Sequence, residues 1–386
     1  MTIKNIDKQY VLNTYNRFDL YLVEGKGSVV KDENKKEYID LTTGIGVTAF
    51  GIADEKWVEA VTNQLTTLQH TSNLYYTSPC ALLAKAICEK TDMSKVFFSN
   101  SGAEANECAI KVARKYAMDK GYDRVNILTL NNSFHGRTLA TLSATGQDHY
   151  HELFNPLPTG FVYADANDID SVIATAKENN VCAIMVECVQ GEGGVIALNK
   201  DFVNAIYDYA KANDILFVVD EVQTGNGRTG QLYAYMNYGI KPDVFTTAKG
   251  LGGGLPIGAC VVGEKAQNTL GFGDHGSTYG GNPVACAGAL SVVERIDDKL
   301  LQDVRKKSEY VFSTLSECEG IEAVTGMGLM IGIKTKKPVS DVIKECMENG
   351  VLCLSAKDKL RLLPALNIDF EILKKAVDVI KSACEN

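Results

Sequence analysis

Two residues with the chemistry of a catalytic centre stand at the ends of neighbouring apolar runs. Asp220 closes the run ILFVVD, and Lys249 follows DVFTTA, just before the glycine-rich segment GLGGGLPIG. A carboxylate at the mouth of a buried strand is costly unless a cation pairs with it, and a protonated pyridine ring is such a cation. A lysine whose pKa is lowered by burial can form a Schiff base with an aldehyde. The pair therefore favours a cofactor that carries both groups.

A third signal lies in FFSNSGAEANECAIKVARKY, which reads as a strand, a turn of small residues and a helix. Ser101, Gly102 and Ala103 open the predicted helix, where free N–H groups and the helix dipole favour a bound phosphate. Taken alone, this turn could be a capped helix without a ligand, and Lys249 could simply reach solvent. The conjunction of three signals on one sheet edge favours the catalytic interpretation.

These side chains need a sheet that brings strand ends together. Between about residues 95 and 280, apolar runs alternate with turns and amphipathic helices, as in βαβ units with a parallel sheet. The runs lie at 96–99, 126–130, 182–187, 215–220, 243–248 and 259–263. Ligands bind outside the carboxyl ends of such strands. The sequence predicts an α/β fold with a mainly parallel sheet flanked by helices.

The remaining segments predict a smaller α/β domain built from both termini. A helical stretch follows Gly281 to about residue 317, and short strands follow in MIGIKT, VLCLS and LRLLP. Gly350 should end the helix before it, and Asp369 should cap the last helix. GSVVKDENKKEYIDL reads as a hairpin around Asn34. We expect a large domain over 46–280 and a small domain from 1–45 and 281–386.

Composition excludes several classes of protein. The 386 residues carry a net charge of −9 without a basic block, which argues against nucleic-acid binding. No apolar run approaches the roughly 20 residues that a membrane span needs, and the N-terminal sequence lacks a secretory pattern, so we expect a cytoplasmic protein. The 11 cysteines are scattered without a C-x-x-C pair, which predicts reduced, mostly buried thiols.

Two other patterns are weak. The segment from Gly225 to Gly230 matches the dinucleotide fingerprint G-x-G-x-x-G, but Asp220 to Thr224 intervene before its first glycine, and Asp243 opens the following strand instead of closing it. We therefore reject a dinucleotide site. His149 and His151 lack a third ligand at helical spacing, so we expect no metal.

Six motifs in order, SGAEAN, SFHGRT, VQGEGG, DEVQTGNGRTG, AKGLGGGLPIGA and GSTYGGNP, make the whole chain resemble the class III (ω-amino acid) aminotransferases of fold type I. The resemblance implies pyridoxal 5'-phosphate as cofactor and Lys249 as its Schiff-base residue. It further implies cofactor contacts from the phosphate-binding Ser101, Gly102 and Ala103, from Asp220 on the ring nitrogen, Glu221, Val222 against one ring face, Gln223 near the phenolic oxygen, and Phe134 on the other ring face. Phe134 could otherwise be an ordinary core aromatic.

The same resemblance implies the substrate contacts. Arg137 suits a carboxylate far from the reacting nitrogen, although a surface ion pair is the common fate of an arginine. Arg361 would receive the α-carboxylate of glutamate or 2-oxoglutarate, and Glu187 would neutralise it when the other donor is bound. Ser277 near the substrate and Thr278 on the phosphate would reach the partner's site in a homodimer, unless they only form turn hydrogen bonds.

NLYYTSP and RLLPALNI resemble the acetylornithine-using branch of the family most closely. This implies transamination of N2-acetyl-L-ornithine with 2-oxoglutarate, as in arginine biosynthesis. Ornithine, 4-aminobutyrate, succinylornithine and succinyldiaminopimelate are alternative donors. The sequence separates them poorly, because they differ in pocket size around Tyr15, Tyr75 and Tyr76 more than in chemistry. A non-catalytic regulator that binds the cofactor is a further alternative. FGIADEKW lacks the family's Gly-His and His-Pro elements, and Cys188 replaces a common proline.

Overall fold

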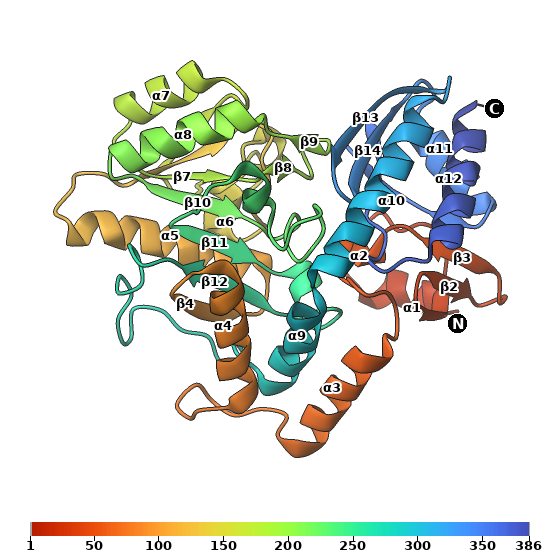
Figure 1. The fold of residues 1–386 in the computed structure, drawn as a ribbon, viewed down its shortest axis with the longest axis horizontal. Helices are drawn as coiled ribbons and strands as arrows, with labels where there is room; N and C mark the ends of the chain where they lie inside the picture. Colours follow the sequence, from red (N-terminus) through yellow and green to blue (C-terminus); the bar gives the residue numbers. More distant parts are fainter. Residues whose placement is uncertain (1, 386) are drawn as a thin grey trace.

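The computed structural model describes residues 2–385 as an α/β protein with a seven-stranded sheet (Figure 1). The strand order is β4-β12-β11-β10-β7-β5-β6, and all neighbours are parallel except those of β12. The strands are β4 (Lys95–Ser99), β5 (Asn126–Leu130), β6 (Phe161–Ala164), β7 (Val181–Val186), β10 (Leu216–Asp220), β11 (Val244–Thr247) and β12 (Gly258–Val262). All six predicted runs are strands of this sheet, which confirms the α/β expectation.

Helices cover both faces of the sheet. α5 (Gly102–Asp119) packs across one face, in a cluster with alternate strand residues such as Leu216 and Val218. The intervening residues Phe217 and Val219 face the opposite cluster, which includes the apolar sides of α7 (Ile169–Glu178) and α8 (Lys200–Ala212). Because both faces are covered, every residue of β7, β10 and β11 is buried, and their sequences are mainly apolar.

A second group of sheets brings together the two ends of the chain. β3 from the first segment pairs in parallel with β15 from the last, within the sheet order β1-β2-β3-β15; a further sheet has the order β13-β14-β17-β16. The strands are β1 (Leu22–Lys26), β2 (Val29–Asp32), β3 (Glu37–Asp40), β13 (Ile321–Met327), β14 (Met330–Thr335), β15 (Val351–Leu352), β16 (Leu354–Ala356) and β17 (Lys359–Leu362), with β8 (Val189–Gln190) and β9 (Ile196–Ala197) as a separate pair.

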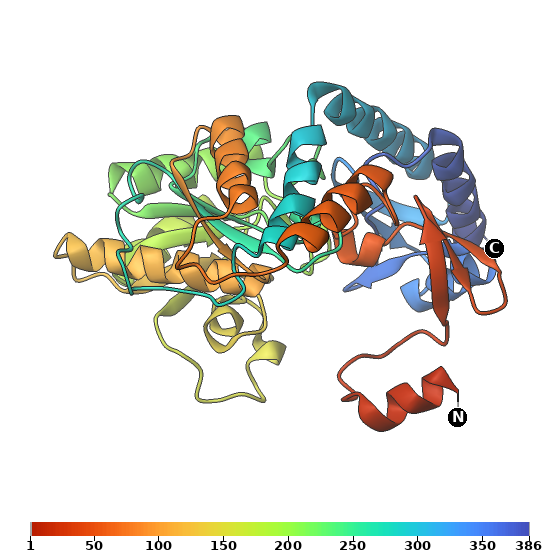
Figure 2. The same cartoon turned by 90° about the horizontal axis from the view of Figure 1, so that it is seen from below.

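The remaining helices complete the molecule. They are α1 (Ile3–Tyr10), α2 (Thr43–Gly46), α3 (Glu55–Thr67), α4 (Ser78–Thr91), α6 (Leu139–Ala144), α9 (Pro283–Arg295), α10 (Asp298–Ser316), α11 (Val339–Glu348) and α12 (Phe370–Glu385), with short 3-10 turns η1 (Asp148–Tyr150), η2 (Ala234–Tyr238) and η3 (Lys249–Leu251). Figure 2 shows α1 standing away from the body, and none of its residues is buried. Within residues 2–385, no helix has the length and apolar character to cross a membrane.

Local signals placed several element ends correctly. The hairpin around Asn34 forms from β2 and β3. Gly350 follows α11 with φ +81°, and the Asp369 carboxylate accepts hydrogen bonds from two N–H groups of the first turn of α12, at 2.9 and 3.1 Å. The predicted helical stretch after residue 281 is two helices, because Asp297 caps a new helix, α10. All 11 cysteines are free, and nine are buried, as predicted.

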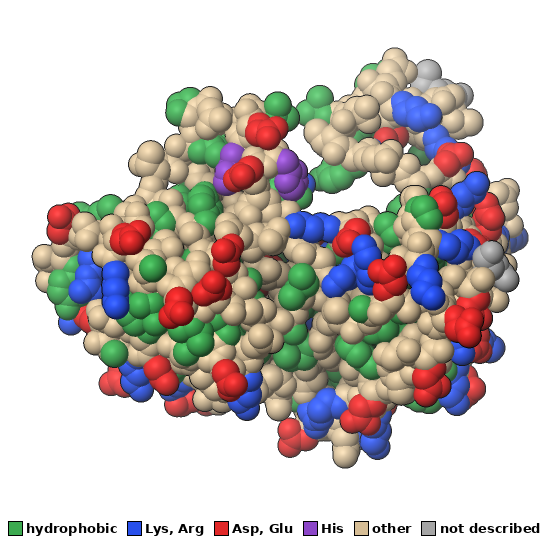
Figure 3. Space-filling model, turned by 90° about the horizontal axis from the view of Figure 1, so that it is seen from above, with side chains coloured by type: hydrophobic (Ala, Val, Ile, Leu, Met, Phe, Trp, Pro, Cys, Tyr) green, Lys and Arg blue, Asp and Glu red, His purple; other side chains and the backbone are tan. Residues whose placement is uncertain are grey.

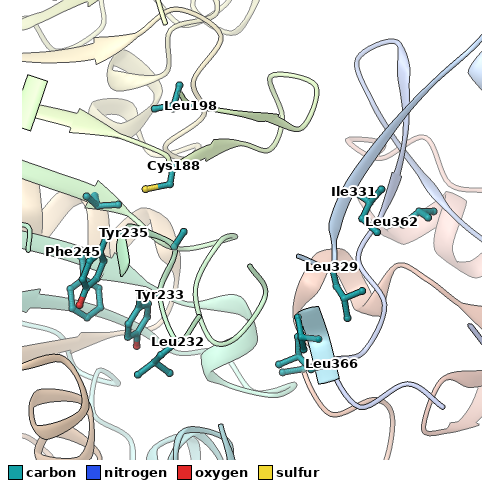
Figure 4. Packing of buried hydrophobic residues seen from close by; sticks show 14 of the residues in the cluster. Cys188, Leu198, Leu232, Tyr233, Tyr235, Phe245, Leu329, Ile331, Leu362 and Leu366 are labelled. Atoms are coloured by element: carbon teal, nitrogen blue, oxygen red, sulfur yellow. The ribbon is translucent and has the colours of Figure 1, made fainter. Parts of the chain in front are cut away.

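One buried cluster joins the large sheet to the C-terminal part. Tyr233, Tyr235 and Phe245 belong to it on one side, and Leu329 and Leu366 on the other (Figure 4). α9, which the sequence assigned to the small domain, packs against α3 and α4. The division into 46–280 and the two terminal segments stays a prediction.

Candidate active site

A cavity of about 450 Å³ opens at the carboxyl ends of β10 and β11, beside the start of α5. Its walls include ten of the residues that the sequence assigned to a site: Ser101, Gly102, Ala103, Phe134, Arg137, Glu187, Asp220, Val222, Gln223 and Lys249. Four others, Glu221, Ser277, Thr278 and Arg361, are not among its lining residues. The fold therefore gathers the main candidates from five separate segments into one space.

Lys249 lies two residues after the end of β11, at the cavity. Its backbone has φ +43°, in the left-handed region that only a constrained side chain adopts. Burial lowers the pKa of the Lys249 amine, and the charge of Arg361 lowers it further against the opposing effect of nearby carboxylates. A lower pKa increases the neutral fraction, which is the nucleophilic form.

The segment from Gly225 to Gly230, which was rejected as a dinucleotide site, holds the backbone next to Lys249 in place. Asn226, inside that motif, donates from its side-chain amide to Thr247 Oγ1 at 2.9 Å and to the Ala248 carbonyl at 3.3 Å, which fixes the chain just before Lys249. Arg228 is buried and donates to the carbonyls of Leu329 and Pro364. The segment is a turn that braces the site against the C-terminal part.

Asp220 ends β10 with its carboxylate 4% exposed. Oδ2 accepts hydrogen bonds from Asn106 Nδ2 and His135 Nδ1, both at 2.8 Å, and Oδ1 accepts from the Val222 N–H at 3.0 Å. Burial would lower the pKa of His135, but the hydrogen bond and charge of Asp220 outweigh it and raise that pKa. The sequence reasoning missed Asn106 and His135, although both stand inside the quoted motifs SGAEAN and SFHGRT.

The first turn of α5 forms a tight cradle. Ser101 Oγ accepts from the Glu104 N–H at 3.2 Å, and the Glu104 carboxylate accepts from the N–H of Asn100, the residue before the N-cap, at 2.8 Å. A Cβ atom on Gly102 would lie 2.6 Å from Val222 Cγ1, so only glycine leaves the backbone this close to the strand end. The N–H groups of such a turn can bind an anion.

Arg361 lies beside the cavity in an ion pair that the sequence did not predict. It donates to Glu192 Oε1 at 2.5 Å and to Gln223 Oε1 at 3.1 Å. The sequence expectation gave the neutralising role to Glu187. In the structure Glu187 instead accepts from the Phe134 and Gly191 N–H groups at 3.0 and 3.4 Å, and burial raises its pKa to about 7. Glu192 could have been considered, since it stands in the quoted motif VQGEGG.

Arg137 is exposed and makes no ion pair within residues 2–385. Its guanidinium lies over the ring of Tyr150, 4.6 Å from the centroid, and 5.8 Å from that of Phe134. Phe134 and Tyr150 pack edge to face at 5.7 Å. Stacking therefore orients Arg137 at the cavity wall and leaves its donors for a carboxylate.

The other predicted residues lie away from the cavity. Glu221 is fully buried behind Asp220 and accepts from the Tyr235 N–H at 2.8 Å and from Thr224. Thr278 is exposed, and Asn73 holds the adjoining loop by donating to the Ser277 carbonyl at 2.9 Å. Neither Ser277 nor Thr278 contributes to the cavity of its own chain.

The family model for class-III aminotransferases matches residues 10–384. The chain belongs to the class-III aminotransferases. It is 48% identical over 381 residues to the acetylornithine aminotransferase of Haemophilus ducreyi, covering 98% of this chain and 97% of that protein. It is 43% identical over 383 residues to the acetylornithine aminotransferase of Methanocaldococcus jannaschii, covering 97% and 96%. The resemblance read from the six motifs is confirmed.

Solved structures of this family have the same fold. The ornithine aminotransferase of Toxoplasma gondii is 29% identical with a TM-score of 0.94, covering 99% of this chain and 93% of that one. The N-acetylornithine aminotransferase of Stenotrophomonas maltophilia is 32% identical with a TM-score of 0.84, covering 98% and 97%. The Toxoplasma structure holds pyridoxal phosphate at its active site with partial occupancy.

Class-III aminotransferases depend on pyridoxal phosphate, and the residues of this cavity fit that group. A buried lysine with a lowered pKa suits the aldehyde, and a buried carboxylate at the end of β10 suits the ring nitrogen. The cradle at Gly102, which a Cβ would close, suits the phosphate. Lys249, Asp220 and the first turn of α5 are therefore the residues that would hold it.

Proposed function

We propose that this aminotransferase transfers the δ-amino group of N2-acetyl-L-ornithine to 2-oxoglutarate, as in arginine biosynthesis. The products are N-acetyl-L-glutamate 5-semialdehyde and L-glutamate. The observation that carries the proposal is the presence of two arginines of different character at one cavity, Arg137 exposed and without an ion pair, and Arg361 buried against Glu192. Two dissimilar carboxylate clamps suit two substrates that present their carboxylates at different distances from the reacting carbon.

When bound, pyridoxal phosphate supplies an aldehyde carbon that accepts the amino group and a ring that takes up electrons released at the substrate carbon. Lys249, whose pKa is lowered by burial, takes the proton from the carbon that carries the amino group and returns a proton in the second half of the cycle. Asp220 would hold the ring nitrogen. Phe134 and Val222 form opposite apolar walls that exclude water.

The arginines divide the substrates between them. Arg137 binds the carboxylate of the acetylated donor, which lies far from the reacting δ-carbon. Glu192 occupies Arg361 during that half of the cycle, and it releases Arg361 when the α-carboxylate of 2-oxoglutarate arrives. The charge and hydrogen bond of Arg361 outweigh burial and hold the pKa of Glu192 below its usual range, so Glu192 is a charged partner at neutral pH.

We further propose a homodimer in which Ser277 and Thr278 reach the partner's cavity, with Thr278 on the phosphate. Support comes from exposed apolar side chains on two adjoining loops, Leu74, Tyr76 and Phe272, of which Tyr76 and Phe272 are fully exposed. No residue of α1 is buried, and the N-terminal segment stands away from the body of the molecule in Figure 3. Contiguous apolar surface of this kind marks interfaces. The cytoplasmic location stays a prediction.

The test is a donor panel with 2-oxoglutarate as acceptor. We expect kcat/KM for N2-acetylornithine to exceed the values for ornithine, 4-aminobutyrate and succinyldiaminopimelate by about tenfold or more, the discrimination that one well-placed polar contact supplies. Succinylornithine should fall between them, because it differs only in the acyl group. A clear preference for free ornithine would refute the donor assignment. If none of the donors converted the bound cofactor to its amine form, the result would favour a regulator instead of an enzyme.

A further inference from the structure

We propose that Asn106 and Thr246 are positioning residues that orient the Asp220 carboxylate toward the ring nitrogen of the cofactor. The inference rests on the proposed function, in which Asp220 pairs with that nitrogen. Asn106 stands on the second turn of α5, and Thr246 stands on β11, next to Asp220 in the parallel ladder. Both side chains are at most 1% exposed.

The three side chains form a directed chain of hydrogen bonds. Thr246 Oγ1 donates to Asn106 Oδ1 at 2.6 Å. Asn106 Nδ2 then donates to Asp220 Oδ2 at 2.8 Å and to the His135 carbonyl at 2.7 Å. The two N–H bonds of one amide are thus both used, and the amide oxygen has its own donor.

Only one orientation of the Asn106 amide satisfies these partners. If the amide were flipped, its oxygen would face the Asp220 carboxylate and the His135 carbonyl, which are both acceptors. The Thr246 hydroxyl is the group that donates to the oxygen in the observed orientation. Thr246 therefore acts on Asp220 through Asn106, without lining the cavity itself.

This arrangement decides which carboxylate oxygen is left for a ligand. Oδ2 accepts from Asn106 and His135, so its two lone pairs are used. Oδ1 accepts only from the Val222 N–H, at 3.0 Å, and keeps one lone pair. Rotation of the carboxylate would break bonds to residues on three different segments. A protonated ring nitrogen bound in the cavity would therefore meet Oδ1.

The test compares pyridoxal phosphate with its analogue in which carbon replaces the ring nitrogen. Both would be titrated into the full-length apoprotein, and dissociation constants would be read from absorbance, for wild type, Asn106→Ala, Thr246→Val and the control Thr129→Val. Thr129 is a fully buried threonine on β5 whose hydroxyl has no partner within residues 2–385, so its replacement removes the same atom without a hydrogen bond.

We expect Asn106→Ala to weaken the binding of pyridoxal phosphate by about tenfold and Thr246→Val by about threefold, because a hydrogen bond to a charged group is lost or loosened. Binding of the analogue should stay within about twofold of wild type in both, since it has no nitrogen to pair. Thr129→Val should match wild type with both compounds.

Equal weakening for the cofactor and the analogue would overturn the proposal, because a merely structural role loosens the cavity for both. Unchanged binding of both compounds in Asn106→Ala would overturn it as well. A wild-type protein that does not distinguish the two compounds would instead refute the pairing of Asp220 with the ring nitrogen, which belongs to the proposed function. The two failures are therefore distinguishable.

Discussion

At the scale of single residues, the site depends on charges that are kept out of water and fixed by named partners. Asp220 is held by three donors, and burial lowers the pKa of Lys249. Arg361 differs from both, because its partner Glu192 belongs to a different segment and must give way to a substrate. In the proposed cycle, exchange of this ion pair is the step at which the enzyme distinguishes its two substrates.

Replacement of Glu192 by glutamine should change the balance between substrates. Without the carboxylate, Arg361 is open throughout the cycle, so glutamate should compete with the acetylated donor. We expect the ratio of kcat/KM for glutamate to that for N2-acetylornithine to rise by about tenfold, as for loss of one partner of a buried pair. Single-turnover absorbance changes with each donor measure the ratio.

Glu187→Gln is the matched control, because Glu187 is also a buried glutamate of the cavity but binds two backbone N–H groups instead of Arg361. It should leave the ratio unchanged. If Glu187→Gln raised the ratio and Glu192→Gln did not, the neutralising role would return to the residue that the sequence suggested.

The site residues that the sequence identified are those whose neighbours along the chain form a recognisable pattern. Lys249 and Asp220 end apolar runs, and Gly102 opens a helix. Asn106 and His135 were missed because their partner Asp220 lies 114 and 85 residues away. Nothing in a linear pattern shows that SGAEAN and SFHGRT converge on one carboxylate, so such positioning residues need the fold.

At the scale of elements, strands buried on both faces were predicted because they are continuous apolar runs. β6 was missed: it lies at the sheet edge, and three of its four residues are only partly buried. β13 was missed as well, since IEAVTGM is half exposed and includes Gly326 with φ +112°. The strands whose ends carry the site residues were predicted from the sequence, because those ends lie in the most buried part of the sheet.

The start of α5 offers the sharpest test at this scale. In Gly102→Ala the new Cβ would lie 2.6 Å from Val222 Cγ1, so the first turn must move away from the strand end. We expect affinity for pyridoxal phosphate to fall by about tenfold and the apoprotein to lose about 1–3 kcal/mol of unfolding free energy, as in overpacked sites. Absorbance titration and urea unfolding measure the two.

Gly271→Ala is the control, since its Cβ would meet only an Asp274 oxygen at 3.6 Å, and it should change neither quantity. Unaltered cofactor affinity in Gly102→Ala would show that the cradle is not the phosphate site.

At the scale of the whole molecule, the loop with Ser277 and Thr278 does not line the cavity of its own chain, and it includes the fully exposed Phe272. The loop is held rigidly by Asn73 and by a hydrogen bond from the Gly280 N–H to Ser277 Oγ at 2.9 Å. An exposed loop that is held in place by hydrogen bonds and does not line its own cavity suits contact with a second copy. The homodimer proposal therefore predicts complementation between protomers.

Two inactive variants should restore activity when they are mixed. Lys249→Ala removes the nucleophile of a protomer's own cavity, and Thr278→Glu places a charge against the phosphate in the partner's cavity. A hybrid dimer then has one site with both defects and one site with none. After unfolding and refolding of an equal mixture, about one quarter of wild-type activity should appear, because half of randomly paired dimers are hybrids with one intact site of two.

Refolding each variant alone is the control. If the mixture stays as inactive as its parts while size measurements show dimers, Thr278 does not serve the partner's site.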